Sequence, residues 1–253
     1  MAVERALFSR CDLHVHTFLS PCGWDEMTPE AIIQAAEKMG MEYISITDHM
    51  HPSISPAIVY QLREEFSRID TKVRIYICCE ADILSVGESV IGPELIAGTD
   101  YIMAAANHFG APWVSKPKSN SRRDVARHLL DMFTYAAGLP HVSVIAHPLY
   151  VMPDTYDPLS PAELTEAELI PAIETAAKNN VAVEISRRAL APEQKPFLVS
   201  FYRLCKEAGL KFSIGNDAHQ IKDVGQTHLV EPIVRELGLT DEDIWLPCSI
   251  TSC

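Results

Sequence analysis

Residues 11–17 read CDLHVHT, an apolar run that ends in two histidines separated by one residue. Alternate side chains of a β-strand point to the same side, so His14 and His16 share one face. Two imidazoles on one face can chelate a single ion. This stretch therefore predicts a first strand with a metal site at its carboxyl end.

The rest of the chain alternates short β-rich runs with helical runs. Strands are expected over 11–16, 42–47, 73–79, 101–106, 142–146, 181–185 and 211–214, and helices over 28–39, 57–69, 93–97, 121–137, 162–178, 192–208 and 230–237. Such alternation predicts parallel β-α units. We expect an α/β barrel of seven or eight strands, with an open doubly wound sheet as the alternative. No break rich in Gly, Ser or Pro divides the chain, so one domain over residues 1–253 is expected.

Every predicted strand leads into residues that can bind a metal or an anion. In chain order these are His14 and His16, then His49 and His51, Glu80, His108, His147, Arg187 and Arg188, and finally Asp217 and His219. The carboxyl ends of the strands in a parallel barrel form its catalytic face. Because the strand interiors are apolar, this distribution is not what chance produces.

The eight predicted metal ligands are His14, His16, His49, Glu80, His108, His147, Asp217 and His219. Imidazole nitrogens with carboxylate oxygens suit Zn²⁺, Mn²⁺ or Fe²⁺. Asp217 and His219 repeat the one-face spacing of the first strand, and Glu80 could bridge two ions, as carboxylates do in two-metal hydrolytic sites.

The two arginines after the sixth strand are candidates for binding a substrate phosphate, which guanidinium groups match bidentately. Arg187 is favoured over Arg188 because it lies nearer the strand. Lys116 and Lys118 are weaker candidates, in a loop over 111–120 that could act as a lid.

Two further histidines differ in their expected roles because one lies near the predicted site and the other does not. His51 is close to the predicted site and could act as a ligand, as an acid or base, or only as a loop residue. His141 precedes the fifth strand at the opposite end of the barrel, and it should have no catalytic role.

Composition excludes some classes of function. With 47% hydrophobic and 22% charged residues and a net charge of −13, the chain has a globular composition and no basic face for nucleic acid. It lacks a run of 18 apolar residues and an evident secretory signal at Met1–Arg5. Seven cysteines without a C-x-x-C pair suggest reduced thiols, so a cytoplasmic protein without a membrane partner is expected.

The ordered motifs together resemble the polymerase and histidinol phosphatase (PHP) superfamily of metal-dependent phosphoesterases. The resemblance covers roughly residues 10 to 220 and rests on Asp12–Thr17, Ile46–His49, Glu80, Asn107-His108, Ala146–Pro148 and Gly215–His219. It implies a distorted seven-stranded (β/α) barrel with up to three divalent ions. It also implies hydrolysis of a small phosphomonoester, such as histidinol phosphate, a sugar phosphate or a nucleotide, by a water that the metals activate.

The resemblance also implies how the ligands are divided. His14, His16, Glu80 and Asp217 would hold one ion, and Glu80, His108 and His147 a second. His49 and His219 would share a third ion with a residue of the loop after His16, where many members have His or Asp. Here the loop offers Cys22 or Asp25, or water fills the position. Arg187 or Arg188 would stabilise phosphoryl charge, and a metal-bound water, Asp217 or His51 would protonate the leaving group.

Three other functions compete with this interpretation. Amidohydrolases also begin with H-x-H, which makes hydrolysis of C–N bonds or lactones the enzymatic alternative. That class typically bridges its metals with a carboxylated lysine, and no lysine ends the third to fifth strands here. An exonuclease is less favoured without a basic groove, and a non-enzymatic regulatory module would be expected to have lost ligands.

Overall fold

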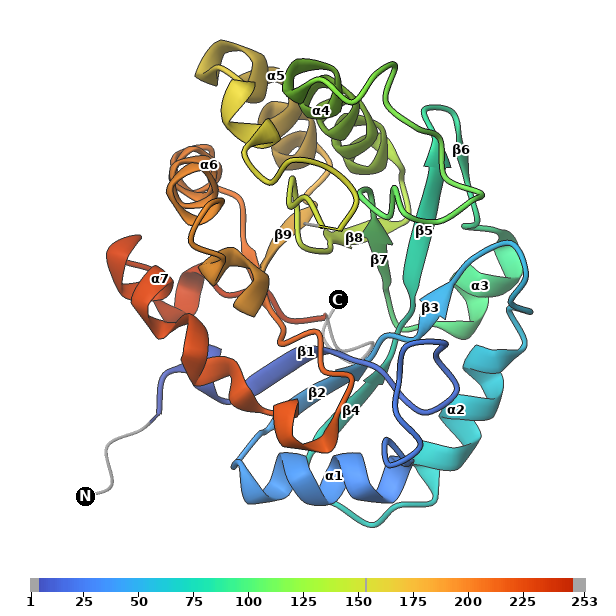
Figure 1. Cartoon of the computed structure of the whole chain (residues 1–253). Coiled ribbons are helices and arrows are strands. Elements are labelled where there is room, and N and C mark those ends of the chain that lie inside the picture. The colour runs from blue at the N-terminus through green and yellow to red at the C-terminus, as the bar shows by residue number, and fades with distance from the viewer. Residues whose placement is uncertain (1–4, 153, 248–253) are drawn as a thin grey trace.

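The computed structural model describes residues 5–152 and 154–247, and it shows helices arranged around a ring of strands (Figure 1). The strands are β1 (Cys11–Val15), β2 (Tyr43–Ile46), β3 (His49–Met50), β4 (Arg74–Ile77), β5 (Glu80–Ser85), β6 (Glu88–Ser89), β7 (Ile102–Ala105), β8 (Val142–Ile145), β9 (Ala182–Ile185) and β10 (Phe212–Ile214). The helices are α1 (Pro29–Lys38), α2 (Ile58–Ser67), α3 (Pro93–Gly98), α4 (Arg122–Gly138), α5 (Glu166–Lys178), α6 (Lys195–Glu207) and α7 (Glu231–Glu236).

The strands form two ladders that together go round the ring. One has the order β1-β2-β4 and the other β10-β9-β8-β7-β5-β3, and all of these pairings are parallel. A parallel bridge between Val15 and Ala218 joins the end of β1 to the segment after β10. The prediction of a distorted seven-stranded α/β barrel is therefore confirmed, although the hydrogen bonding is interrupted rather than continuous.

The interruptions explain where the predicted boundaries were wrong. The expected strands over 42–47 and 73–79 each break after four paired residues, and the chain resumes pairing as β3 and β5. His49 and Glu80 are partners in this second register. Glu80 thus opens a strand instead of following one, while β6 adds an antiparallel hairpin strand that was not predicted.

Local chemistry accounts for the helix positions. The Thr28 side chain accepts a hydrogen bond from the backbone N–H of Ala31 at the start of α1, and Ser121 caps α4 in the same way. Thr165 and Glu168 form a capping box at α5. The apolar faces of the helices pack against the ring, and buried hydrophobic residues form one cluster from Cys11 to Ile244. That residues 1–253 make a single domain stays a prediction.

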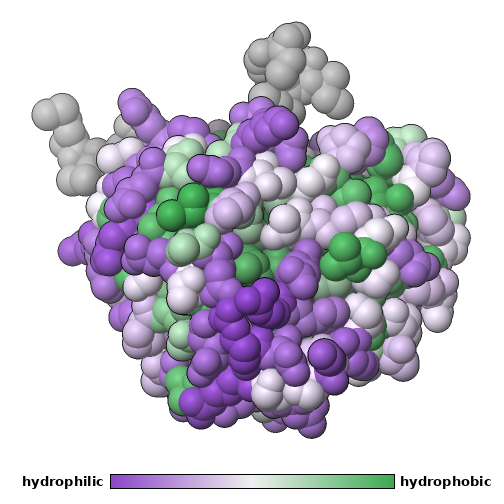
Figure 2. Space-filling view, turned by 90° about the horizontal axis from the view of Figure 1, so that it is seen from above, coloured by the Kyte–Doolittle hydropathy of each residue, from purple (hydrophilic) through white to green (hydrophobic). Residues whose placement is uncertain are grey.

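Figure 2 shows one face of the exterior, coloured by hydropathy. The face seen in Figure 2 is mostly hydrophilic, with apolar residues in small separate groups. Among the residues described, no helix combines the length and the apolar character needed to cross a bilayer. Five cysteines in these ranges are free thiols, while Cys248, Cys253 and the first four residues of the N-terminal segment considered above lie outside them.

Candidate metal centre

The structure brings all eight predicted ligands together on one side of the ring, although His49 and Glu80 are the first residues of β3 and β5 rather than the last residues of strands. His14 and His16 are fully buried at the base of the site. Above them is a cavity of about 530 Å³, and its lining includes His49, Glu80, His108, His147, Asp217 and His219. This volume is in the range of a small-molecule site.

Glu80 is at the centre of the cluster, with imidazoles on several sides. Its Oε2 lies 3.5 Å from His14 Nε2, 3.6 Å from His16 Nε2 and 3.0 Å from His49 Nδ1. Its Oε1 lies 2.7 Å from His147 Nε2 and 3.4 Å from His108 Nε2. Five imidazoles around one buried carboxylate are the arrangement expected of a carboxylate that bridges metal ions.

Electrostatics keep this carboxylate ionised. Burial raises the pKa of Glu80, but the charges of His49, His108 and His14 outweigh burial and hold that pKa well below its usual range. Oε2 is buried and has no hydrogen-bond partner of acceptable geometry. A buried carboxylate oxygen without a partner is costly, and a bound cation would satisfy it.

The first predicted set of ligands has spacings suited to one ion. His14 Nε2 and His16 Nε2 are 3.1 Å apart, and Asp217 Oδ1 lies 3.6 and 3.2 Å from them. With the two distances to Glu80 Oε2, these five separations run from 3.1 to 3.6 Å. Ligands in a tetrahedron around Zn²⁺ at bond lengths of ~2.0–2.1 Å are roughly 3.3 Å apart, so each of the five separations suits ligands of one ion, and His14, His16 and Glu80 together form a group able to hold a metal.

Buried carboxylates outside the ligand set fix which ring nitrogen faces the centre. Glu184 Oε1 lies 2.7 Å from His14 Nδ1, and Asp82 Oδ1 lies 2.7 Å from His108 Nδ1. A ring that donates from Nδ1 presents the lone pair of Nε2, as a metal requires. Glu184 also accepts a hydrogen bond from the backbone N–H of His147 at 2.7 Å. Neither carboxylate was predicted to have a role, although Glu184 lies within a predicted buried strand and Asp82 follows another by three residues.

Two of the ligands have a backbone conformation that side chains other than glycine rarely adopt. His147 has a φ of 27° and Asp217 a φ of 54°. Such conformations persist only where the surroundings enforce them, and they cluster at functional sites. For His147, two hydrogen bonds enforce the conformation. Its backbone N–H donates to Glu184, and Asn107 Nδ2 donates to its carbonyl at 3.3 Å.

Gly215 allows the close approach of His14 and Glu184. A Cβ at this position would lie 2.4 Å from His14 Cβ and 2.5 Å from Glu184 Oε1. We expect Gly215→Ala to weaken metal binding roughly 10–100-fold, the usual cost of disturbing an outer partner of a metal ligand. Metal titration against a chelating dye measures this. Gly138→Ala is the matched control, because its Cβ would meet nothing within 4 Å; equal metal affinity in both variants would contradict this role.

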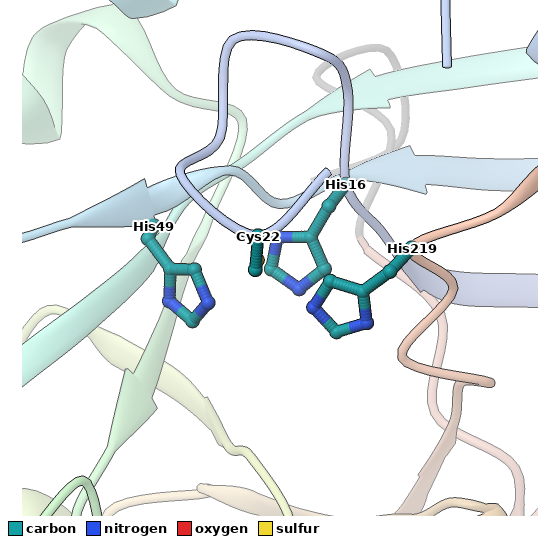
Figure 3. Close-up of side chains that lie close together, drawn as sticks. All are labelled: His16, Cys22, His49 and His219. Carbon is teal, nitrogen blue, oxygen red and sulfur yellow. The ribbon is translucent and has the colours of Figure 1, made fainter. Parts of the chain in front are cut away.

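Cys22 joins the third predicted set. The ligand atoms of His16, Cys22, His49 and His219 all lie within 4.8 Å of one another, and Figure 3 shows these side chains converging. Burial raises the pKa of the Cys22 thiol, but hydrogen bonds with His219 and His49 outweigh it and lower the pKa to about 6. Asp25 is exposed to solvent. Of the two loop residues considered from the sequence, the structure places Cys22 in the cluster.

The preference for Arg187 over Arg188 does not agree with the structure. Arg188 lines the cavity and its Nε donates to Asp217 Oδ2. Arg187 is paired instead with Asp223, at 3.1 Å. The reason is that residues 187–190 form a 3₁₀ turn directly after β9, so neighbouring side chains point in different directions. Closeness to the strand end was therefore a poor guide.

The remaining candidates divide into those at the cavity and those away from it. His51 lines the cavity and stacks on Trp113, with ring centroids 4.3 Å apart. The loop over 111–120, which was considered as a lid, is held in place by hydrogen bonds. Trp113 Nε1 donates to Asp82 at 2.6 Å, and Lys116 donates to the carbonyls of residues 109 and 111. Lys118 and His141 are exposed, and neither is among the residues lining the cavity.

Known proteins resemble the chain along most of its length. The family profile described as "PHP domain" matches residues 12–188. A "Probable phosphatase" of Caldicellulosiruptor bescii is 25% identical over 93% of this chain and 90% of its own. A "Probable histidinol-phosphatase" of Deinococcus radiodurans is 24% identical over 85% of this chain and 88% of its own. The crystal structure of histidinol phosphate phosphatase from Lactococcus lactis, complexed with zinc, L-histidinol and phosphate, superposes with a TM-score of 0.61 at 16% identity, covering 94% of this chain and 99% of that one.

Proposed function

Because this chain belongs to the PHP domain family, we propose that it is a metal-dependent hydrolase of small phosphomonoesters. The observation that carries this proposal is Glu80, a buried carboxylate with imidazole nitrogens near both of its oxygens. The relatives support the same chemistry, since both are named as phosphatases. A site of this kind binds divalent cations.

We propose two or three divalent ions, Zn²⁺, Mn²⁺ or Fe²⁺, held by the eight predicted ligands. His14, His16, Glu80 and Asp217 would hold the first, and Glu80 with His108 and His147 the second. The distances within the first set fit one ion, and Glu80 Oε1 faces both histidines of the second. Zinc is the metal named in the Lactococcus lactis structure. When bound, such ions lower the pKa of a coordinated water and neutralise phosphoryl oxygens.

The chain's own residues position the substrate. Arg188 is 27% exposed at the cavity and is held by Asp217 and by contact with the Tyr150 ring, 5.8 Å from its centroid. Its guanidinium would bind phosphoryl oxygens bidentately, and the contact would strengthen as charge spreads in the transition state. Asp217 would act as a ligand beside it. His51 would meet the leaving group at the cavity wall, together with the Trp113 ring.

Histidinol phosphate is one substrate we propose, because the Lactococcus lactis enzyme was crystallised with L-histidinol and phosphate. Sugar phosphates and nucleotides are the other phosphomonoesters to test. The walls contributed by Trp113, Met152 and Ala111 are apolar, and they would contact the organic part of the substrate. A cytoplasmic location, and no use of nucleic acid, are also proposed from the thiols and the acidic composition.

The test begins with metal content. We expect at least two ions per chain after purification without chelator and supplementation with Zn²⁺ or Mn²⁺, because eight predicted ligands converge on one cavity and more than one group of them is close enough to hold an ion. Elemental analysis that finds fewer than about one transition metal per chain would contradict the metal sites.

Activity is then measured on a panel of phosphomonoesters, with an amide and a lactone as controls. We expect hydrolysis of phosphomonoesters that a chelator abolishes and added metal restores. Cleavage of only the amide or the lactone would instead favour the amidohydrolase alternative, because a metal-activated hydroxide can attack either class of bond.

A further inference from the structure

The loop after β1 is folded so that Cys22 points at two histidines. The backbone N–H of Ser20 donates to the Thr17 carbonyl at 3.1 Å, and that of Gly23 donates to the Ser20 carbonyl at 3.0 Å. The N–H of Trp24 donates to the His219 carbonyl at 3.1 Å, which ties the loop to the segment after β10. These backbone hydrogen bonds fix the conformation of the loop and therefore the position of Cys22.

Gly23 shows how tightly this loop is folded. A Cβ at Gly23 would lie 1.9 Å from the Thr17 carbonyl oxygen, so only glycine fits directly after Cys22. Ser20 adds side-chain contacts, with its Oγ 3.3 Å from His16 Nδ1 and accepting from the His49 N–H at 3.2 Å. The loop, the first strand and β3 are therefore connected around the thiol.

The side chains that could ligate a metal beside this loop are one thiol and two imidazoles. His16 Nε2 already lies within 3.6 Å of the oxygens of Glu80 and Asp217 in the first set. Cys22, His49 and His219 remain, and they extend from three separate segments toward one point (Figure 3). His49 and His219 are 21% and 18% exposed, so the point they face opens to the cavity.

We propose that Cys22, His49 and His219 form a thiolate-containing third metal site that selects a thiophilic ion such as Zn²⁺ over Mn²⁺ or Mg²⁺. The proposal rests on the proposed function for the other two sites and adds the chemistry of this one. Thiolate favours Zn²⁺, whereas carboxylate and water suit Mn²⁺ and Mg²⁺. Three protein ligands with an open position are typical of a catalytic rather than a structural zinc site. The third ion would therefore differ in kind from ions bound by oxygen and nitrogen alone.

Spectroscopy on the cobalt-loaded protein tests the sulfur ligand directly. We expect the wild type, loaded with Co²⁺, to show thiolate-to-cobalt charge-transfer absorption in the near ultraviolet. Cys22→Ser should lose this band and bind one ion fewer per chain. Its affinity for Zn²⁺ at the third site should fall by more than about 100-fold, because loss of even an outer partner of a ligand costs 10–100-fold.

Cys22→His is the matched variant, since it replaces the thiolate by a nitrogen ligand. We expect it to regain the third ion without the charge-transfer band, and to take up Mn²⁺ more readily relative to Zn²⁺ than the wild type does. Iodoacetamide should alkylate Cys22 in the metal-free wild type and not in the zinc-loaded protein, as read by peptide mass spectrometry. The buried Cys205 serves as the internal reference.

The proposal is overturned if the cobalt protein has no charge-transfer band, or if Cys22→Ser binds as many ions as the wild type. These readouts do not depend on catalysis. A protein that shows the band but hydrolyses no phosphomonoester would overturn the proposed function alone. An active phosphatase without the band would overturn only the role of Cys22.

Discussion

Glu80→Gln is expected to lower phosphomonoester turnover by roughly 10³-fold or more, beyond the 10²–10³-fold cost of losing a single oxyanion donor. The variant keeps the size of the side chain but removes the charge that the two proposed ion sites would share. It should also bind fewer ions, because His108 and His147 lose their common carboxylate partner. Steady-state kinetics and elemental analysis of the same preparation measure both effects.

His141→Ala is the control for this prediction, because His141 is exposed and lies just before β8, away from the cluster. We expect its turnover and metal content to match the wild type. Thermal denaturation of all three proteins shows whether each is folded. Equal losses of activity at Glu80 and His141, in proteins of equal stability, would refute the placement of the metal centre.

Arg188→Ala is expected to lower turnover on the order of 10²-fold, comparable to the loss of one donor that stabilises transition-state charge. It should also weaken inhibition by inorganic phosphate, because Arg188 is the one arginine or lysine among the described residues that line the cavity. Arg187→Ala should have little effect, since Arg187 makes an ion pair with the partly exposed Asp223 and a long hydrogen bond of 3.4 Å to the Asp217 carbonyl, and contacts of this kind contribute little.

Metal content separates two roles of Arg188. The side chain also pairs with Asp217, a predicted ligand, so a loss of activity could come from loss of an ion. Elemental analysis of Arg188→Ala should find the wild-type number of ions if phosphate binding is the main role. Full phosphatase activity and full phosphate inhibition in this variant would show that Arg188 does not bind the substrate.

The order of strands and ligands followed from local patterns. Strand interiors such as Leu13 and Ile44 are apolar, while His14, His147 and Asp217 come at or just after strand ends. Because parallel strands of a barrel deliver their carboxyl ends to one face, the sequence alone could place these residues together. Both the fold class and the convergence of the eight ligands were predicted on this basis.

Local patterns could not show the breaks in β2/β3 and β4/β5. The run over 73–79 remains apolar through its break at Cys78-Cys79, and the other break falls at Thr47-Asp48, where the predicted strand ends, so periodicity does not indicate that pairing resumes after either break. The second register appears only when His49 of β3 pairs with Glu80 of the adjacent strand β5. The choice between Arg187 and Arg188 was equally invisible, because it depends on the direction of each side chain in a 3₁₀ turn.

Sequence patterns alone predicted the class of fold, the eight candidate ligands and the hydrolytic chemistry that such ligands would support. The groups that contact those candidate ligands, and the loop residue that lies beside His49 and His219, became evident from the tertiary structure. Glu184 is 170 residues from His14 in the chain, yet the two share a hydrogen bond. The sequence offered Cys22 and Asp25 equally as the loop ligand, and the backbone hydrogen bonds of the folded loop place the Cys22 thiol beside the histidines. Contacts between distant segments carry no local pattern, so they are decided by how the strands and loops pack.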